Sequence, residues 1–166
     1  MIDIRTGQGF DVHAFADDAA RATLPADRQL ILGGVAFPGE RVLVGHSDAD
    51  VIAHAAADAL LGAAGLGDIG MHYPDTDPAW KGADSLKILA DAAAKVRAQG
   101  WRIGNVDCSV VCESPKIAPH RDAMVENLTR AAGAPVSVKG RRAEGLGAIG
   151  RGEGIACFAS AVIIKE

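Results

Sequence analysis

The chain has 166 residues, of which 49% are hydrophobic and 23% are charged, and its formal net charge is -4 at pH 7. This composition is typical of a folded globular protein and argues against disorder, and the length suits a single domain over residues 1–166. The negative charge argues against a general binder of polyanions, and an aromatic content of only 4% argues against a base-stacking surface. We therefore expect no nucleic-acid partner.

Cysteine usage and apolar runs indicate the compartment. Cys108, Cys112 and Cys157 form no Cys-x-x-Cys pair, so a disulfide framework and a thiolate zinc site are both disfavoured. Buried free thiols in a reducing cytoplasm are the simplest interpretation. The N-terminus shows no signal-peptide or transit-peptide pattern, and no apolar run reaches the roughly 18 residues of a membrane span. We expect a cytoplasmic protein with no membrane contact.

Hydrophobic periodicity, caps and turn residues predict the order of the secondary structure. The first half comprises a strand and loop over 4–15, a surface loop over 16–28, a hairpin over 29–37, a helix over 47–64 and a loop over 66–78. The second half comprises a helix over 84–99, a strand over 101–112, a turn over 113–116, a helix ending near 132, a strand over 136–139, a glycine-rich loop over 140–154 and a strand over 155–164.

This order predicts an α+β fold, a single-domain mixed β-sheet with three main helices on one face. The other face would be bare, and a homo-oligomer that packs sheet against sheet would cover it. Gly7 and Gly9 lie in the first strand without the third glycine and the helix of a nucleotide fingerprint. They are better explained by a bend or by the close approach of another chain.

The densest polar stretch opens the first predicted long helix. Ser47 or Asp48 is a good N-cap, and Ser47 with Asp50 resembles a capping box. Asp50, His54 and Asp58 recur at i, i+4 and i+8, which places them on nearly one helix face. This ridge is a candidate metal or phosphate site, and a solvated face with ion pairs is an equal alternative.

Asp11 and His13 alternate along the first strand and therefore point to the same side of it. Such a pair is often plain polar surface, and it gains meaning only if a third ligand arrives from elsewhere. With His54 the pair would offer two imidazole nitrogens and one carboxylate oxygen, a set that suits Zn²⁺ and leaves a fourth position open. An open position implies Lewis-acid action on a substrate oxygen.

Phosphate-binding groups could gather beside such a metal. His46 and Ser47 would lie at the N-terminus of the same helix, where free N–H groups bind phosphate. Glu144 could hold a second, harder cation bridged by phosphate oxygens. The late segment would add three cationic side chains, Lys139, Arg142 and Arg151. The polar loop over 66–78 is long enough to be functional, although a plain connector is the alternative.

Several long motifs stand in a fixed order along the chain. They are Gly9-Phe10-Asp11-Val12-His13, His46-Ser47-Asp48-Ala49-Asp50 with His54, Leu66-Gly67-Asp68-Ile69-Gly70, Pro74-Asp75-Thr76-Asp77-Pro78, Lys81-Gly82-Ala83-Asp84-Ser85, Gly104-Asn105-Val106-Asp107 and Gly150-Arg151-Gly152-Glu153-Gly154-Ile155-Ala156. In this order they are similar to the motifs of the 2-C-methyl-D-erythritol 2,4-cyclodiphosphate synthase family. The resemblance covers nearly the whole chain.

The resemblance implies an enzyme, a cyclising phosphorus–oxygen lyase of non-mevalonate isoprenoid biosynthesis. The family converts 4-diphosphocytidyl-2-C-methyl-D-erythritol 2-phosphate to 2-C-methyl-D-erythritol 2,4-cyclodiphosphate and CMP, as the 2-phosphate attacks the β-phosphorus. The mechanism combines positioning with charge neutralisation of an in-line displacement. The resemblance also implies a cytoplasmic bacterial homotrimer with active sites between its subunits, which would cover the bare sheet face.

The resemblance assigns two cations and two catalytic positions. Asp11, His13 and His54 match the ligands of one Zn²⁺ per subunit. Glu144 matches the ligand of a Mg²⁺ or Mn²⁺ on the diphosphate of a small-molecule cytidine diphosphate substrate. His46, which would steady the transition state, and the residue at position 142 occupy the catalytic positions. The second of these is Arg142 in this chain.

Three segments match the substrate pocket of the family. Residues 68–70 would hold the ribose, residues 73–77 would form a mobile loop over the methylerythritol phosphate, and residues 112–118 would line the cytosine pocket through backbone groups. The substrate-binding residues implied in this way are Asp11, His13, His46, Ser47, Asp68, Ile69, Gly70, Tyr73, Pro74, Asp75, Thr76, Asp77, Cys112, Pro115, Lys116, Ile117, Ala118, Arg141, Arg142, Glu144 and Arg151.

The chain departs from the family just before Glu144. The family usually has Lys-Ala-Thr-Thr and a small residue, where this chain has Lys139-Gly140-Arg141-Arg142-Ala143, and Ala148 stands where the family usually has Phe. An arginine binds phosphate bidentately, but it is also large enough to obstruct the site. A trimeric paralogue without catalysis or with altered specificity, which binds a nucleotide or a phosphorylated isoprenoid, is therefore the alternative. A zinc hydrolase of another phosphate ester is a third hypothesis.

Overall fold

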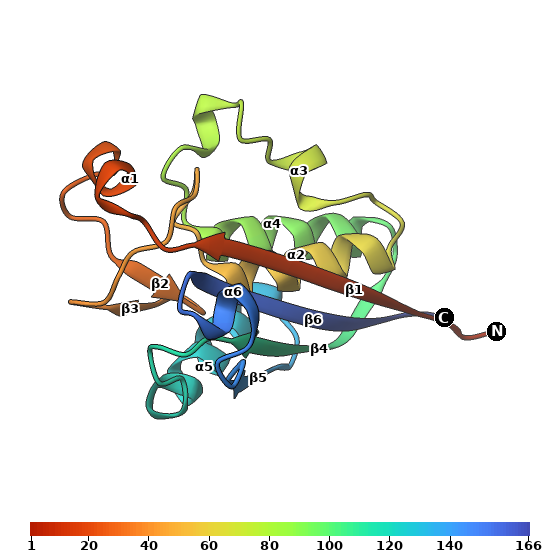
Figure 1. The fold of residues 1–166 in the computed structure, drawn as a ribbon. Helices are drawn as coiled ribbons and strands as arrows, with labels where there is room; N and C mark the ends of the chain where they lie inside the picture. Colours follow the sequence, from red (N-terminus) through yellow and green to blue (C-terminus); the bar gives the residue numbers. More distant parts are fainter.

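Four strands form one mixed sheet in the computed structural model, which describes residues 1–166 (Figure 1). β4 and β5 pair in parallel, and the other two pairs are antiparallel. A two-residue turn, Gly33-Gly34, joins the strands of a separate hairpin. Across the sheet the order is β1 (Asp3–Ala14), β6 (Gly154–Lys165), β4 (Arg102–Val111) and β5 (Val136–Arg141), and the hairpin comprises β2 (Leu30–Leu32) and β3 (Val35–Phe37). The predicted mixed sheet is confirmed.

Three long helices cover one face of this sheet. They are α2 (Val51–Ala63), α4 (Ser85–Ala98) and α5 (Arg121–Ala132). α2 packs on β1 and β6, α5 packs on β5, and α4 lies against both helices (Figure 1). Along β6, Cys157, Ala159 and Ala161 are buried in the core, whereas Phe158 and Ser160 between them are exposed on the opposite face. The predicted α+β arrangement is therefore present.

Short helices occupy three of the segments that were predicted to be loops. They are α1 (Asp18–Thr23), α3 (Ile69–His72) followed by the 3-10 turn η1 (Pro78–Trp80), and α6 (Gly147–Gly150), while a second 3-10 turn, η2 (Ala118–His120), leads into α5. The loop prediction is wrong at these places, because helices of one or two turns are too short to show a 3.6-residue period. α1 depends on its cap, since Asp17 Oδ1 accepts a 2.8 Å hydrogen bond from Ala20 N.

Gly7 and Gly9 lie where β1 crosses α2. A Cβ atom at Gly9 would stand 2.0 Å from the carbonyl oxygen of Ala55, and one at Gly7 would stand 2.1 Å from that of Ala59. Only glycine fits at such distances from another backbone. The predicted close approach is present, but the approaching backbone is α2 of the same chain and not another chain. This contact brings the end of β1 against the first turns of α2.

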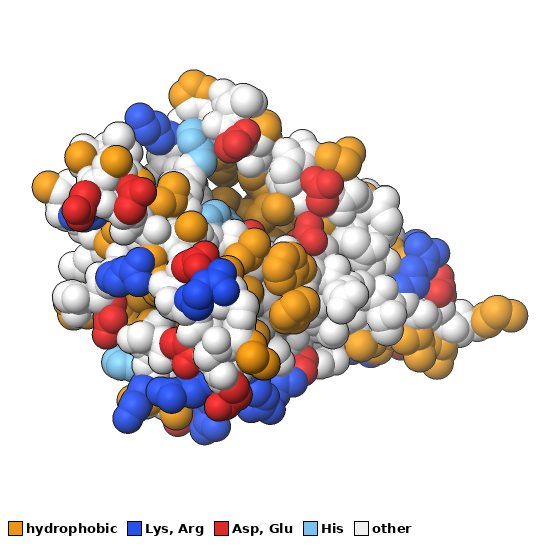
Figure 2. All heavy atoms as spheres, viewed as in Figure 1, with side chains coloured by type: hydrophobic (Ala, Val, Ile, Leu, Met, Phe, Trp, Pro, Cys, Tyr) orange, Lys and Arg blue, Asp and Glu red, His pale blue; other side chains and the backbone are white.

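The sheet face turned away from the helices is uncovered. Phe10 and Phe158 pack across β1 and β6 with ring centroids 4.8 Å apart, and they are 51% and 46% exposed. Ile4 and Val12, on the same face of β1, are also exposed. Figure 2 shows hydrophobic side chains gathered over the strands in the middle of this view. Contiguous apolar surface of this kind usually marks an interface, as the bare face predicted from the sequence requires.

All three cysteines are buried as free thiols, as predicted. Burial, reinforced by the charge of Glu113, raises the pKa of the Cys112 thiol to about 11. A thiol with so high a pKa stays protonated at neutral pH and is a poor nucleophile. None of the helices is both long enough and apolar enough to cross a membrane.

Candidate metal centre and active site

Asp11, His13 and His54 converge on one point. β1 supplies the first two side chains and α2 supplies the third, and one ligand atom from each lies within 4.8 Å of the others. Asp11 Oδ2 lies 3.2 Å from His13 Nε2 and 3.0 Å from His54 Nδ1. The three side chains are only 12–24% exposed. The triad predicted from sequence is thus brought together by the close packing of β1 on α2.

The backbone fixes which nitrogen of His13 can bind a metal. His13 Nδ1 lies 2.6 Å from the carbonyl oxygen of Val44, which can only accept a hydrogen bond, so Nδ1 donates. In the neutral ring, Nε2 then carries a lone pair and points it at the Asp11 carboxylate. Two acceptors 3.2 Å apart repel one another unless a cation or a proton lies between them. This arrangement fits a divalent cation.

The two histidines keep the Asp11 carboxylate ionised, the form in which it can bind a metal. Burial raises the pKa of Asp11, but hydrogen bonds and charge from His13 and His54 outweigh burial and hold this pKa well below its usual range. Burial lowers the pKa of His13, yet the hydrogen bond and charge of Asp11 raise it above its ordinary value. Two imidazoles and an ionised carboxylate form the donor set of open zinc sites.

The triad lines a cavity of about 290 Å³. His46 lies in the same wall, and its Nε2 is 3.0 Å from the carbonyl oxygen of Asp77, which lies between the lining residues Asp75 and Trp80. Figure 2 shows a hollow in this view with histidine side chains at its rim. The lining residues are Asp11, His13, Gly45, His46, Ser47, His54, Ile69, Tyr73, Asp75, Trp80 and Ile88.

The predicted start of the helix is wrong. α2 begins at Val51, and its N-cap is Asp50 rather than Ser47 or Asp48. Asp50 is fully buried, and its carboxylate accepts hydrogen bonds from the N–H groups of Ile52 and Ala53 and from both glycines of the β2–β3 turn. Asp50 therefore does not belong to a polar ridge with His54. His46 and Ser47 lie in the extended segment before the helix, not in its first turn.

Replacing Asp50 by alanine is expected to lower the free energy of unfolding by about 3 kcal/mol or more, because four backbone N–H groups lose their acceptor. Urea denaturation would measure the loss. Asp84→Ala is the matched control, since Asp84 caps α4 through a single 2.9 Å bond from Leu86 N and should cost only about 1 kcal/mol. Equal losses in the two variants would contradict the role of Asp50 as a tie between α2 and the hairpin.

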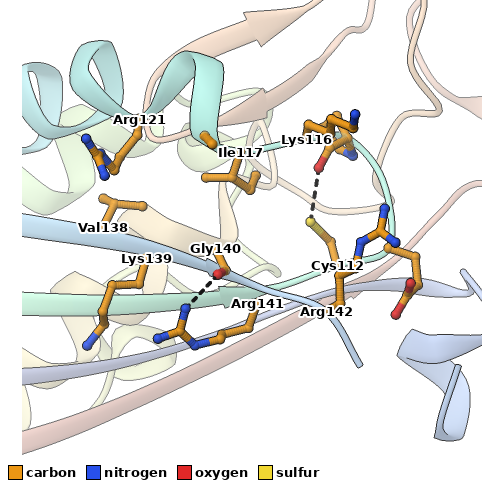
Figure 3. A pocket seen from close by; sticks show the side chains of 12 residues that line it. Cys112, Lys116, Ile117, Arg121, Val138, Lys139, Gly140, Arg141 and Arg142 are labelled. Atoms are coloured by element: carbon orange, nitrogen blue, oxygen red, sulfur yellow. Dashed lines mark hydrogen bonds between the residues drawn. The ribbon is translucent and has the colours of Figure 1, made fainter. Parts of the chain in front are cut away.

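A second cavity, of about 390 Å³, lies between the turn after β4 and the end of β5 (Figure 3). Its wall carries five cationic side chains and a single acid, Glu113, whose carboxylate accepts from the N–H of Ala143. Figure 3 shows Lys139 and Arg141 reaching to one side of β5, with Arg142 beside Cys112. The lining residues are Cys112, Glu113, Pro115, Lys116, Ile117, Ala118, Arg121, Val138, Lys139, Gly140, Arg141 and Arg142.

Both cavities are lined by predicted site residues, and the two cavities share no lining residue. Some predicted residues line neither cavity, namely Asp68, Gly70, Pro74, Thr76, Asp77, Glu144 and Arg151. Asp68 caps α3, and Arg151 pairs with Glu153 at 2.6 Å. A substrate that touches all of these residues must therefore reach beyond either cavity of one chain.

Sequence reasoning assigned no role in the site to Ser85, Trp80 or Arg121, and two of these three residues line a cavity. Ser85 lines neither cavity, but it is buried and its hydroxyl lies 2.8 Å from His54 Nε2. Trp80 lines the metal cavity, and Arg121 lines the cationic one. Local pattern carries no signal for Ser85 or Trp80. The position of Arg121 shortly after the predicted cytosine segment was the available hint of a further cation.

Comparison with known proteins agrees with this geometry. The model of the YgbB family matches residues 4–164. A 2-C-methyl-D-erythritol 2,4-cyclodiphosphate synthase of Bordetella petrii is 53% identical over 167 residues, which cover 99% of this chain and 98% of that protein. The structure of IspF from Plasmodium falciparum in complex with CDP is 34% identical, with a TM-score of 0.80, and the match covers 98% of this chain and 97% of that chain.

A longer protein also contains this fold. The structure of the bifunctional IspDF from Campylobacter jejuni has a TM-score of 0.89 and 41% identity, and the match covers 100% of this chain but only 43% of that one. This chain therefore spans less than half of the bifunctional protein. The family model and the relatives agree with the motifs in the sequence, and the chain belongs to the YgbB family of 2-C-methyl-D-erythritol 2,4-cyclodiphosphate synthases.

Proposed function

We propose that the chain converts 4-diphosphocytidyl-2-C-methyl-D-erythritol 2-phosphate to 2-C-methyl-D-erythritol 2,4-cyclodiphosphate and CMP. The observation that carries this proposal is the convergence of Asp11, His13 and His54 in the wall of a cavity. The name of the Bordetella relative, at 53% identity, supports it. The reaction serves non-mevalonate isoprenoid synthesis, and residues 1–166 act as one cyclodiphosphate synthase domain in the cytoplasm.

The reaction is an internal displacement at phosphorus. An oxygen of the 2-phosphate attacks the β-phosphorus and forms the new P–O bond. The bond from that phosphorus to the CMP oxygen breaks, and CMP leaves with the electron pair. No side chain forms a covalent bond to substrate, so catalysis consists of holding the two phosphates in line and balancing their charge. His46 suits this task, because the N–H that faces Asp77 O can donate to a phosphate oxygen instead.

Two cations complete the site in this proposal. Asp11, His13 and His54 would hold one Zn²⁺ per subunit, and Glu144 would hold a Mg²⁺ or Mn²⁺ with the substrate diphosphate. When bound, these cations supply positive charge to phosphate oxygens. Glu144 is exposed in the segment between β5 and α6, so its carboxylate can turn toward a ligand.

We also propose a homotrimer in which the uncovered sheet faces pack together. The exposed Phe10 and Phe158 supply the apolar contact. The separation of the two cavities supports the same assembly, because a neighbouring subunit can bring its cationic cavity to the metal cavity of the first. In this arrangement residues 68–70 hold the ribose, residues 73–77 cover the methylerythritol phosphate, and residues 112–118 hold the cytosine.

Phe158→Glu is expected to convert the assembly of three chains to a single chain, since three carboxylates would be buried in one apolar interface. Sedimentation equilibrium would measure the mass. Met71→Glu is the control, because Met71 is 71% exposed on α3 and lies outside the sheet face. A Phe158→Glu variant that keeps the parental mass would show that this face is not the interface.

The arginine pair distinguishes this chain from its family. Relatives at about half identity are named as synthases, so a protein without catalysis is not favoured. We place Arg141 and Arg142 on the substrate diphosphate, with Arg142 at a catalytic position. Their guanidinium groups bind the phosphates that threonine hydroxyls bind in the family. The other cationic side chains of the cavity attract the anionic substrate.

Replacing both arginines by threonine is expected to raise KM for the substrate roughly tenfold, the equivalent of about one charge-assisted hydrogen bond. Steady-state kinetics would measure the change. Arg130→Thr on α5 is the control, because Arg130 pairs with Glu126 and lines neither cavity. A higher kcat in the double variant would show instead that the arginines obstruct the site.

Turnover of the purified protein tests the proposed function directly. The protein is incubated with the diphosphocytidyl substrate, Zn²⁺ and Mg²⁺ in water enriched in oxygen-18. We expect cyclic diphosphate and CMP in equal amounts, without label in either product. Label in a phosphate product would identify hydrolysis in place of cyclisation, and the lack of any product would overturn the proposal.

A further inference from the structure

We propose that Asp48 and Ser85 are positioning residues of the metal centre, which hold His54 in the one tautomer whose free lone pair points at the cation. This inference rests on the proposed function only in requiring that the triad binds a divalent cation. It concerns side chains outside the triad, and its basis is a chain of hydrogen bonds that runs from Asp48 through Ser85 to His54.

The hydroxyl of Ser85 stands between a carboxylate and an imidazole. Its Oγ donates to Asp48 Oδ1 and lies 2.8 Å from His54 Nε2. An ionised carboxylate can only accept hydrogen bonds, so the single proton of the hydroxyl goes to Asp48. Ser85 Oγ is left with lone pairs alone, and His54 Nε2 must donate to it. A neutral imidazole has one N–H, so His54 Nδ1 is unprotonated.

The unprotonated nitrogen faces the metal position. His54 Nδ1 lies 3.0 Å from Asp11 Oδ2, on the side where His13 Nε2 also points. His13 reaches the matching state by a different route, because its Nδ1 donates to the carbonyl of Val44. The two rings therefore present opposite nitrogens, and each does so because its other nitrogen already has an acceptor. Such outer partners orient metal-binding histidines and raise their affinity.

Burial and further hydrogen bonds stabilise this series of hydrogen bonds from Asp48 to His54. Ser85 is fully buried, and Ser47, whose hydroxyl lies 3.0 Å from His54 Nε2, is only 7% exposed, so water cannot readily replace either hydroxyl. Asp48 is tied in place from three sides, since it also accepts from Ser85 N at 3.1 Å and from Asp50 N at 3.3 Å.

A structural role in helix capping does not account for Ser85. α4 begins at Ser85, but its N-cap is Asp84, whose side chain accepts from Leu86 N. The Ser85 hydroxyl is therefore not needed to begin the helix, and it turns toward the metal centre instead. Asp84→Ala removes a side chain from the same helix end without touching His54, so it is the matched control for Ser85→Ala.

The test compares the metal-free and zinc-bound forms of the parent, Ser85→Ala, Asp48→Asn and Asp84→Ala proteins. Zinc dissociation constants are measured by competition with a chromophoric chelator, without substrate. Long-range proton–nitrogen NMR spectra of the metal-free parent report which nitrogen of His54 is protonated. We expect the proton on Nε2 in the parent, and a loss of zinc affinity of roughly 10- to 100-fold in Ser85→Ala. Asp48→Asn should show a smaller loss, and Asp84→Ala should bind zinc like the parent.

The outcomes separate this inference from the proposed function. A His54 proton on Nδ1 in the metal-free parent would overturn the inference, and this measurement needs no variant to fold. Parental zinc affinity in a folded Ser85→Ala, or equal losses in Ser85→Ala and Asp84→Ala, would also overturn it. A parent protein that binds zinc with the expected tautomer but makes no cyclic product would refute the proposed function and leave the positioning role standing.

Discussion

Replacing His54 by alanine is expected to lower kcat for cyclic diphosphate formation by about a thousandfold or more. The variant keeps only two of the three ligand side chains that meet within 4.8 Å. A bound cation typically supplies several kcal/mol of stabilisation to a phosphoryl transition state, and about 4 kcal/mol corresponds to a factor of a thousand. Zinc content measured by atomic absorption should fall in parallel with turnover.

His120→Ala is the control for this variant, because His120 lies in η2 and packs on Phe37, away from the triad. It should keep zinc and turnover near the parental values. The thermal unfolding of both variants in the presence of a chelator should remain close to that of the metal-free parent. A His54→Ala protein with turnover within tenfold of the parent would show that the triad is not the catalytic metal centre.

Gly9→Ala is expected to destabilise the fold by about 3 kcal/mol or more, the upper range of overpacking costs. The added Cβ would lie 2.0 Å from Ala55 O and 2.7 Å from Ala59 N, both backbone atoms that cannot rotate away. β1 and α2 must separate to admit it. Because Asp11 lies two residues further along β1, the variant should also lose zinc affinity even where it remains folded.

Gly62→Ala provides the matched control within the same packed pair. Gly62 lies in α2, and the nearest atom to a Cβ there is Gln8 O at 4.0 Å. Alanine should be neutral or stabilise the helix by about 0.5–1 kcal/mol. Urea denaturation of the two variants gives the comparison. Similar stability of Gly9→Ala and Gly62→Ala would contradict the account of the close approach.

Long elements with clear periodicity were predictable from the sequence. α4 has its cap, its amphipathic pattern and Gly100 at its end, and β6 is a continuous apolar run, so both appear close to their predicted bounds. Short helices such as α1 and α6 were missed, because a few residues give no period. The donor types of Asp11, His13 and His54 identified the metal triad, since these side chains suit few other tasks in combination.

What the sequence determined by itself is the class of fold, the three donor side chains that meet at the candidate metal centre, and the family. What the tertiary structure decided depends on contacts between distant residues. α2 begins at Val51 because the Asp50 carboxylate binds a glycine turn that lies 17 residues earlier. His54 is paired with Ser85, 31 residues away, and the predicted pocket is divided between two cavities. A local sequence pattern reflects interactions between residues that are neighbours in the sequence. These hydrogen bonds join distant residues, so they form only when the folded chain brings their partners together.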